Sequence, residues 1–199
     1  MTADIVDATP ADAAAIAALI AEAFQHLDVA QWLVPPSAEQ RRSVLEADFR
    51  IFVDHALSHG IVQTSPNRTG VAMWFPPAAQ AREPADYDVR LAAACGPWID
   101  RFRALDTAFA EHHPHSPAHH HLGFLAVRPD RQCRGLGSDL LRHHHQRLDE
   151  AGLPAYVEAS STRSRALYLR HGYRPHGEPF SPVDGGPPLW PLWRQPASG

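Results

Sequence analysis

The stretch that decides the fold runs Leu122-Gly-Phe-Leu-Ala-Val127, then Arg128-Pro-Asp-Arg131, then Gln132-Cys-Arg-Gly-Leu-Gly-Ser138. Its apolar first part, which a proline closes, predicts a β-strand. Leucines recur at helical spacing after it and predict a helix from the second glycine, Gly137, to a stop at Gly152. The chain must reverse sharply between strand and helix, and the two glycines allow backbone angles that a side chain forbids.

A glycine-rich turn that leads into a helix is a favourable place for an anion. The first amides of a helix have no intrahelical acceptor, and the helix dipole adds positive charge beside them. The turn therefore suits phosphate or pyrophosphate, and Arg131 and Arg134 flank it. It is not a Walker loop, because no Gly-Lys-Ser/Thr follows, and the three-glycine dinucleotide fingerprint is absent as well. The alternative is a turn whose glycines are purely structural.

The order of an apolar strand, Val-x-Pro and Gln/Arg-x-x-Gly-x-Gly resembles the acetyl-CoA motif of the GNAT N-acyltransferase superfamily. The resemblance implies an α+β fold in which helices flank a mixed central sheet of six to seven strands and a splayed strand pair holds the cofactor. It implies acetyl-CoA as cosubstrate, with pantetheine contacts at Leu125, Ala126 and Val127. It also implies pyrophosphate contacts from the turn residues Cys133, Arg134, Gly135, Leu136, Gly137 and Ser138.

The segment Ala166-Leu-Tyr-Leu-Arg-His-Gly-Tyr173 resembles a second signature of that superfamily, a tyrosine on a short helix that glycine and an aromatic follow. The resemblance places Tyr168 near the thioester sulfur as a catalytic residue. A phenol, with a pKa of about 10 against about 8.5 for a thiol, can protonate or stabilise the departing thiolate. The alternative is a tyrosine that only packs over the helix.

An amine must lose a proton before it attacks a thioester, and Glu158 is the first candidate for the base. It comes near the end of a predicted strand over residues 155–159, where the two strands part, so its carboxylate is expected to face the cleft. We expect partial burial to raise its pKa. The alternative is a glutamate that only pairs with Arg163 or Arg165. His121 and His26 are weaker candidates for the base, since imidazole titrates near neutrality.

The order Leu-Pro-Ala-Tyr-Val-Glu-Ala-Ser, Arg-Ala-Leu-Tyr and Arg-His-Gly-Tyr is similar to the puromycin N-acetyltransferase branch. Only residues 122–177 carry this likeness specifically, and they mostly handle the cofactor, so the identity of the acceptor does not carry over. Ser164 stands where that branch often has Asn, which weakens the cofactor contact assigned to Ser164.

We expect one domain over residues 1–199, with the acceptor side in the N-terminal half and the acetyl-CoA-binding core at 122–177. An antiparallel hairpin over 61–75 and a partly helical insertion over 78–121 precede that core. Residues 25–36 are predicted to form a loop, which in this superfamily borders the acceptor site. The substrate-binding candidates there are Phe24, His26, Asp28 and Trp32; core packing is an equally good explanation for Trp32.

The composition limits the kinds of partner that we expect. A net charge of −4 argues against binding to nucleic acid, and no apolar run is long enough to span a membrane. Two cysteines without metal spacing indicate a reduced, cytoplasmic protein, either monomer or homodimer. The alternative reading of Cys133 as a nucleophile is disfavoured by its place in the turn.

Histidines crowd residues 112–121 and 143–145, but they match no standard metal spacing and no cysteine or carboxylate framework accompanies them, so we expect no metal.

Together these features predict an N-acetyltransferase that moves an acetyl group from acetyl-CoA to a primary amine of a small molecule, such as puromycin or another antibiotic. Two alternatives stay open. One is an acyl-CoA-binding sensor, or inactive GNAT module. The other is an acetyltransferase for the N-termini of peptides or proteins, which needs an open groove rather than a walled pocket.

Overall fold

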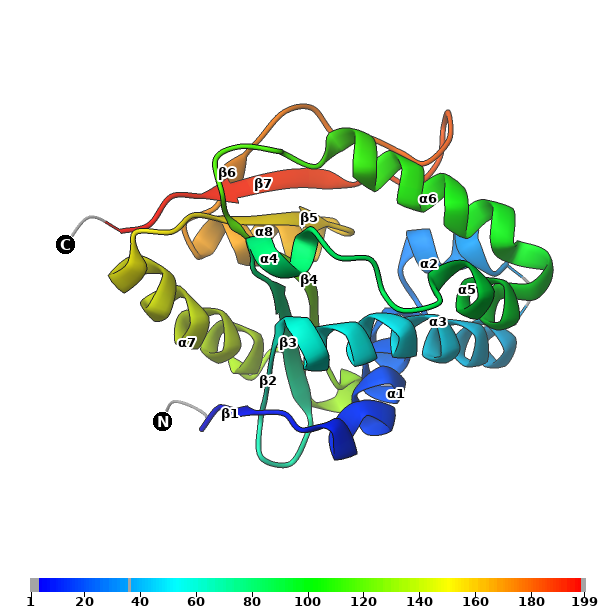
Figure 1. Ribbon diagram of the computed structural model, residues 1–199, viewed down its shortest axis with the longest axis horizontal. Helices are drawn as coiled ribbons and strands as arrows, with labels where there is room; N and C mark the ends of the chain where they lie inside the picture. Colours follow the sequence, from blue (N-terminus) through cyan, green and yellow to red (C-terminus); the bar gives the residue numbers. More distant parts are fainter. Residues whose placement is uncertain (1–3, 36, 198–199) are drawn as a thin grey trace.

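The computed structural model describes residues 4–35 and 37–197, and within them the chain forms a mixed seven-stranded sheet of order β1-β2-β3-β4-β5-β7-β6 (Figure 1). This confirms the predicted α+β architecture. The strands are β1 Val6–Asp7, β2 Ile61–Thr64, β3 Gly70–Phe75, β4 His120–Val127, β5 Ala155–Ala159, β6 Arg174–Pro175 and β7 Trp190–Arg194.

Helices cover both faces of this sheet. They are α1 Ala13–Phe24, α2 Asp28–Leu33, α3 Ala38–His59, α4 Pro77–Gln80, α5 Tyr87–Cys95, α6 Ile99–His112, α7 Leu136–Ala151 and α8 Thr162–Arg170, with short 3-10 turns η1 Pro10–Asp12, η2 Gly96–Trp98 and η3 Pro129–Arg131. In Figure 1, α7 lies on one side of the sheet and α1, α3 and α5 lie on the other. In the part of the chain described, no helix combines the length and the apolar character that crossing a bilayer requires.

The two faces of β3 belong to two different cores because side chains alternate along a strand. Val71, Met73 and Phe75 pack into a core with α1, α3 and α5. Ala72 and Trp74 pack into a second core, to which α7 and α8 contribute leucines and Tyr168. The sheet is therefore buried on both sides, and its centre is a rigid platform for whatever lies at its strand ends.

Most of the predicted elements form close to their expected bounds. The β2–β3 hairpin is antiparallel, with Gln63 opposite Ala72, and α7 begins one residue before the predicted start at Gly137. The prediction of a loop over 25–36 is wrong, since α2 lies within it. This helix is only six residues long, and burial of Ala30 and Leu33 against the N-terminal core stabilises it rather than any strong local signal.

The parallel strands β4 and β5 are paired over only a short length, which leaves a gap in the sheet. It pairs at only two positions, His120 with Ala155 and His121 with Tyr156. Beyond them β4 stays paired with β3 as far as Val127, and β5 stays paired with β7 as far as Ala159. The two strands therefore part in the middle of the sheet, as predicted for a splayed pair.

Candidate active site

The turn between β4 and α7 has the backbone geometry that its glycines predict. Cys133 and Gly135 have φ angles of +59° and +89°, both in the left-handed region. The first helical hydrogen bond runs from the Asp139 amide to the Gly135 carbonyl at 2.9 Å. The amides of Leu136, Gly137 and Ser138 thus precede that bond and have no acceptor within the helix. Together with the helix dipole they form an anion-binding N-terminus.

A cleft of about 660 Å³ lies between this turn, β4, α8 and the end of α1. It brings together almost all of the cofactor-binding residues proposed from the sequence. Those on its wall are Leu125, Ala126, Val127, Cys133, Gly135, Leu136, Gly137, Ser138 and Ser164. Arg134 is exposed and is not among the described residues that line the cleft.

Three further arginines border the cleft, of which the sequence pointed only to Arg131. Arg163 and Arg170 come from α8 and reach the same space. The Arg163 Nη2 atom lies 3.0 Å from the Cys133 sulfur, so it donates across 30 positions of sequence. No local sequence pattern predicts that contact, because it depends on how α8 packs beside the turn. The cleft therefore offers guanidinium groups as well as amides to a diphosphate.

Tyr168 lies on α8 and is only 5% exposed, yet it lines the cleft. Its ring packs 5.6 Å from the ring of Tyr173. Burial, and then the nearby negative charge of Glu158, raise the pKa of the Tyr168 phenol well above its usual range. The phenol therefore keeps its proton at neutral pH and is a hydrogen-bond donor rather than an anion.

Glu158 lies on β5 and its side chain is 5% exposed; it is not among the described residues that line the cleft, contrary to the expectation that its carboxylate faces it. Its Oε2 atom lies 2.8 Å from the His121 Nε2 atom, so the predicted pairing with Arg163 or Arg165 is replaced by a pairing with histidine. Burial alone raises the pKa of this carboxyl, but the charge of His121 and hydrogen bonding to His113 and His121 outweigh it and hold the pKa at about 2. The expectation of a raised pKa is wrong, because the neighbouring histidines could not be inferred from the local sequence.

The other end of the cleft meets the N-terminal half. Phe24 and His26 line it. The ring of Phe24 lies 5.7 Å from Phe49 and 6.3 Å from Phe124, and Phe124 lies 5.7 Å from Phe52. These aromatic rings form an apolar wall beside β4.

Two of the proposed substrate-binding residues lie elsewhere. Asp28 is exposed at the start of α2, and Trp32 packs against the N-terminal core. The Trp32 carbonyl accepts a hydrogen bond from Arg101, whose guanidinium lies 5.9 Å from the Trp32 ring. In the described part of the chain, neither residue lines the cleft.

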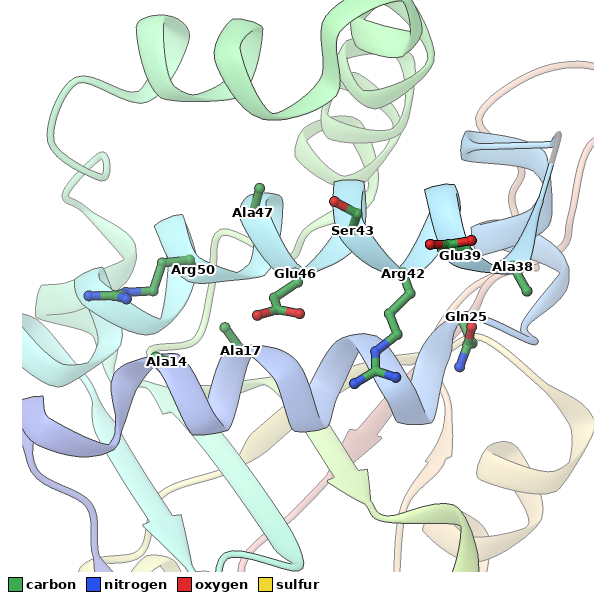
Figure 2. A pocket seen from close by; sticks show the side chains of 10 residues that line it. All are labelled: Ala14, Ala17, Gln25, Ala38, Glu39, Arg42, Ser43, Glu46, Ala47 and Arg50. Carbon is green, nitrogen blue, oxygen red and sulfur yellow. The ribbon is translucent and has the colours of Figure 1, made fainter.

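A second hollow of about 750 Å³ lies on the outer surface between α1 and α3. Figure 2 shows its wall, with Arg42 and Glu46 extending from α3 above the alanines of α1. It shares no described lining residue with the cleft. The first residues of α3, Ala38 and Glu39, lie on its wall, but the Ser37 hydroxyl already accepts from the Gln40 amide and the Glu39 carboxylate adds negative charge, so this helix end is a poor seat for an anion. We therefore place the chemistry in the cleft.

A mixed sheet whose central strands part over a cleft, with a helix N-terminus at its floor, defines the class of coenzyme A-dependent acyltransferases. A sequence profile of the acetyltransferase (GNAT) family matches residues 71–173, just over half of the chain. The chain therefore belongs to the GNAT acetyltransferase family, whose members use acetyl-CoA. The puromycin-like branch is a finer assignment that this match does not test.

Solved structures of the family resemble the whole chain. One is described as histone acetyltransferase HPA2 and related acetyltransferase from Corynebacterium glutamicum; it is 26% identical, with a TM-score of 0.71 over 100% of this chain and 99% of that one. Another is the ribosomal-protein-S18-alanine N-acetyltransferase of Escherichia coli, 16% identical, with a TM-score of 0.54 over 98% and 95%. A third is the PaiA N-acetyltransferase of Thermoplasma acidophilum in complex with coenzyme A, 10% identical, with a TM-score of 0.56 over 98% and 99%. The last two show a shared fold alone.

Proposed function

We propose that this protein transfers an acetyl group from acetyl-CoA to the primary amine of a small molecule, such as puromycin or another amine antibiotic. The observation that carries the proposal is the cleft of about 660 Å³ between the parted strands, with the unpaired first amides of α7 on its wall. The same reading makes the protein a cytoplasmic enzyme, in keeping with its two free cysteines.

The residues of the cleft fit acetyl-CoA in two places. The amides of Leu136, Gly137 and Ser138 donate to a diphosphate, and the arginines at the rim add charge. Past His121, the edge of β4 is not paired with β5, so its backbone groups are open to the amides of a pantetheine arm. The ligand then takes the place of the missing strand contacts.

The side chains nearest to the parting of the strands supply the proton transfers. Neutral His121, whose ring Glu158 orients from 2.8 Å, accepts the proton that the amine loses, either directly or through a water molecule, and the Glu158 carboxylate, with a pKa of about 2, stays ionised and stabilises the charged imidazole. Tyr168, which stays protonated, donates to the thiolate as it leaves. Backbone N–H groups of β4 at Leu125 to Val127 polarise the thioester carbonyl.

The acceptor binds on the aromatic side. Phe24 and the rings behind it offer an apolar surface next to β4, and His26 closes the same end of the cleft. An apolar wall of aromatic rings suits a small amine with an apolar or aromatic body.

A screen of thiol release tests this proposal. Purified protein with acetyl-CoA is offered amine antibiotics including puromycin, polyamines, amino acids and peptides, and products are identified by mass. We expect steady release of coenzyme A with a small amine and an acetylated product. Release with peptides alone would replace the proposal by N-terminal acetylation of peptides or proteins. Binding of acetyl-CoA without release for any amine would replace it by a sensor.

A further inference from the structure

Three side chains from three separate elements meet beside the cleft. His113 follows the last residue of α6, His121 lies on β4 and Glu158 on β5. One nitrogen or oxygen atom from each lies within 4.8 Å of the other two. The two histidine side chains are 22% exposed and the glutamate side chain is 5% exposed. In the described residues, the Glu158 Oε1 atom is buried without a hydrogen-bond partner.

The hydrogen bonds around His113 decide which of its nitrogens carries a proton. The side-chain nitrogen Nε2 of Gln80 donates to two backbone carbonyls, that of Phe75 at 2.7 Å and that of His119 at 2.8 Å. The Gln80 Oε1 atom is therefore the acceptor for His113 Nε2, 3.1 Å away. The Nε2 atom of His119 also lies 3.2 Å from His113 Nε2, and His119 uses its Nδ1 to donate to the Pro117 carbonyl. Both contacts put the proton of His113 on Nε2.

In this tautomer of His113, the lone pair of Nδ1 faces the carboxylate of Glu158. With its proton on Nε2, neutral His113 presents the lone pair of Nδ1, and that atom lies 3.8 Å from Glu158 Oε1. Two acceptors that face each other inside the protein repel, unless a cation lies between them: either a proton on Nδ1, which makes His113 the hydrogen-bond donor that lowers the Glu158 pKa, or a metal ion. His121 Nε2, at 2.8 Å from Glu158 Oε2, completes the set from the other side.

We propose that His113, His121 and Glu158 form a binding site for a divalent transition-metal ion, and that the ion it selects is Zn²⁺. Two imidazole nitrogens and one carboxylate oxygen are a donor set that zinc takes, with a fourth position left for water. Imidazole donors disfavour Mg²⁺ and Ca²⁺, which need oxygen ligands. Bonds of about 2.0–2.1 Å in tetrahedral geometry hold ligand atoms roughly 3.3 Å apart. The two histidines contact different oxygens of Glu158, His121 at 2.8 Å from Oε2 and His113 at 3.8 Å from Oε1, so a small rotation of the carboxylate is needed to bring one oxygen to this separation from both nitrogens.

Gln80 gives the site an outer layer of support. A metal-binding histidine generally donates its second ring N–H to a carbonyl or carboxylate, which fixes the orientation of the ring. His113 already makes this bond to Gln80, which two backbone carbonyls hold in place. The arrangement needs small movements of three side chains and no change of the backbone pairing.

A bound ion has a consequence for the transferase. It occupies Glu158 and His121, the pair to which we assign the proton from the amine, and therefore inhibits acetyl transfer. This consequence rests on the proposed function, whereas the binding of the ion does not.

The binding is tested by calorimetry on the chelator-treated full chain with Zn²⁺ alone, and by the absorption spectrum with Co²⁺. His113→Gln keeps an N–H donor near the position of Nε2 and removes the Nδ1 ligand. His115→Gln, an exposed histidine of the same segment, is the matched control. We expect one tight equivalent and a tetrahedral Co²⁺ spectrum for the wild type and the control, and for His113→Gln a loss greater than the roughly 10–100-fold that follows removal of an outer partner.

Equal affinity in all three proteins would overturn the site, because it would mean that scattered surface histidines bind the ion. Circular dichroism confirms that each variant is folded. In the activity arm, Zn²⁺ is expected to inhibit the wild type and His115→Gln but not His113→Gln, each measured against its own rate without the ion. One tight equivalent without inhibition supports the metal site and overturns the assigned role of Glu158 and His121 in proton transfer.

Discussion

The Oε2 atom of Glu158 lies 2.8 Å from the Nε2 atom of His121, and the two residues belong to the two strands that part to open the cleft. His121 itself belongs to the last pair that joins the strands, opposite Tyr156, and Glu158 comes two residues further along β5. The carboxylate–imidazole pair therefore lies at the closed end of the opening. An amine that approaches a thioester held between the strands finds its proton acceptor there.

We predict that Glu158→Gln lowers kcat about 10²–10⁴-fold, because glutamine keeps the shape of the side chain and removes the negative charge that stabilises His121 when it takes up the proton. The Kd for acetyl-CoA should stay unchanged, since Glu158 is not among the described residues that line the cleft. Steady-state kinetics with the best amine from the screen, together with calorimetry, measure both. The control is Glu150→Gln, the same change at an exposed position of α7. A Glu158→Gln enzyme with wild-type turnover would remove this residue from the mechanism.

We predict that Tyr168→Phe lowers kcat by a similar factor and leaves the Kd for acetyl-CoA within about twofold, because the lost hydroxyl acts on the leaving thiolate. Tyr173→Phe is a matched control: it deletes a hydroxyl from an equally buried ring 5.6 Å away that does not line the cleft. Unchanged turnover of Tyr168→Phe across the pH range would refute the assignment. An equal loss in Tyr173→Phe would mean that the hydroxyls serve packing and not chemistry.

Two buried histidines of α7 predict how stability depends on pH. The ring of His144 stacks on Trp74 at 4.2 Å, and His145 Nε2 lies 3.1 Å from the Tyr173 hydroxyl. Burial lowers the pKa of His144 to about 2 and that of His145 to about 3. The unfolded chain takes up both protons near pH 6.5, whereas the folded chain resists them, so this stability is complete above about pH 6.5 and falls as the pH drops below it.

Each of these histidines contributes a slope of up to about 1.4 kcal/mol per pH unit below pH 6.5. Urea unfolding between pH 7 and pH 5 measures the total slope, to which the buried Asp48 carboxyl, whose pKa burial raises to about 8, adds a contribution of opposite sign. His144→Gln should reduce it, and His143→Gln, at a half-buried neighbour, should not. Equal slopes in the wild type and in His144→Gln would contradict the burial of a neutral imidazole at His144.

Local patterns were sufficient for the cofactor side of the molecule. The leucines of α7 and the paired glycines before it are short-range signals, and they predicted the turn and the helix. The family resemblance that starts from them supplied nine of the residues on the cleft wall. The six-residue helix α2 was missed because only burial of Ala30 and Leu33 stabilises it. A hydrophobic contact of that kind is set by the rest of the fold and leaves no periodic pattern in so short a segment.

The proton-acceptor side depended on contacts that no local pattern encodes. His113 follows α6 and Glu158 lies on β5, with β4 and the long helix α7 between them in the chain, and only the tertiary fold brings them together. For that reason the sequence suggested a raised pKa for Glu158, whereas the histidines lower it. The same long separation in the sequence explains why no carboxylate partner could be recognised there for the histidines of residues 112–121.

The central claim is that a diphosphate and a pantetheine arm lie between β4 and the first turn of α7, and calorimetry with acetyl-CoA on a graded series at Gly137 tests it most directly. A Cβ atom at Gly137 would meet the Leu167, Val127 and Leu125 side chains at 3.6, 3.8 and 4.0 Å, which is ordinary contact, so larger residues fit the fold but extend into the cleft. We predict one equivalent of acetyl-CoA for the wild type, weaker binding for Gly137→Ala, and at least about 100-fold weaker binding for Gly137→Leu at an unchanged melting temperature. Undiminished affinity in Gly137→Leu would contradict the account.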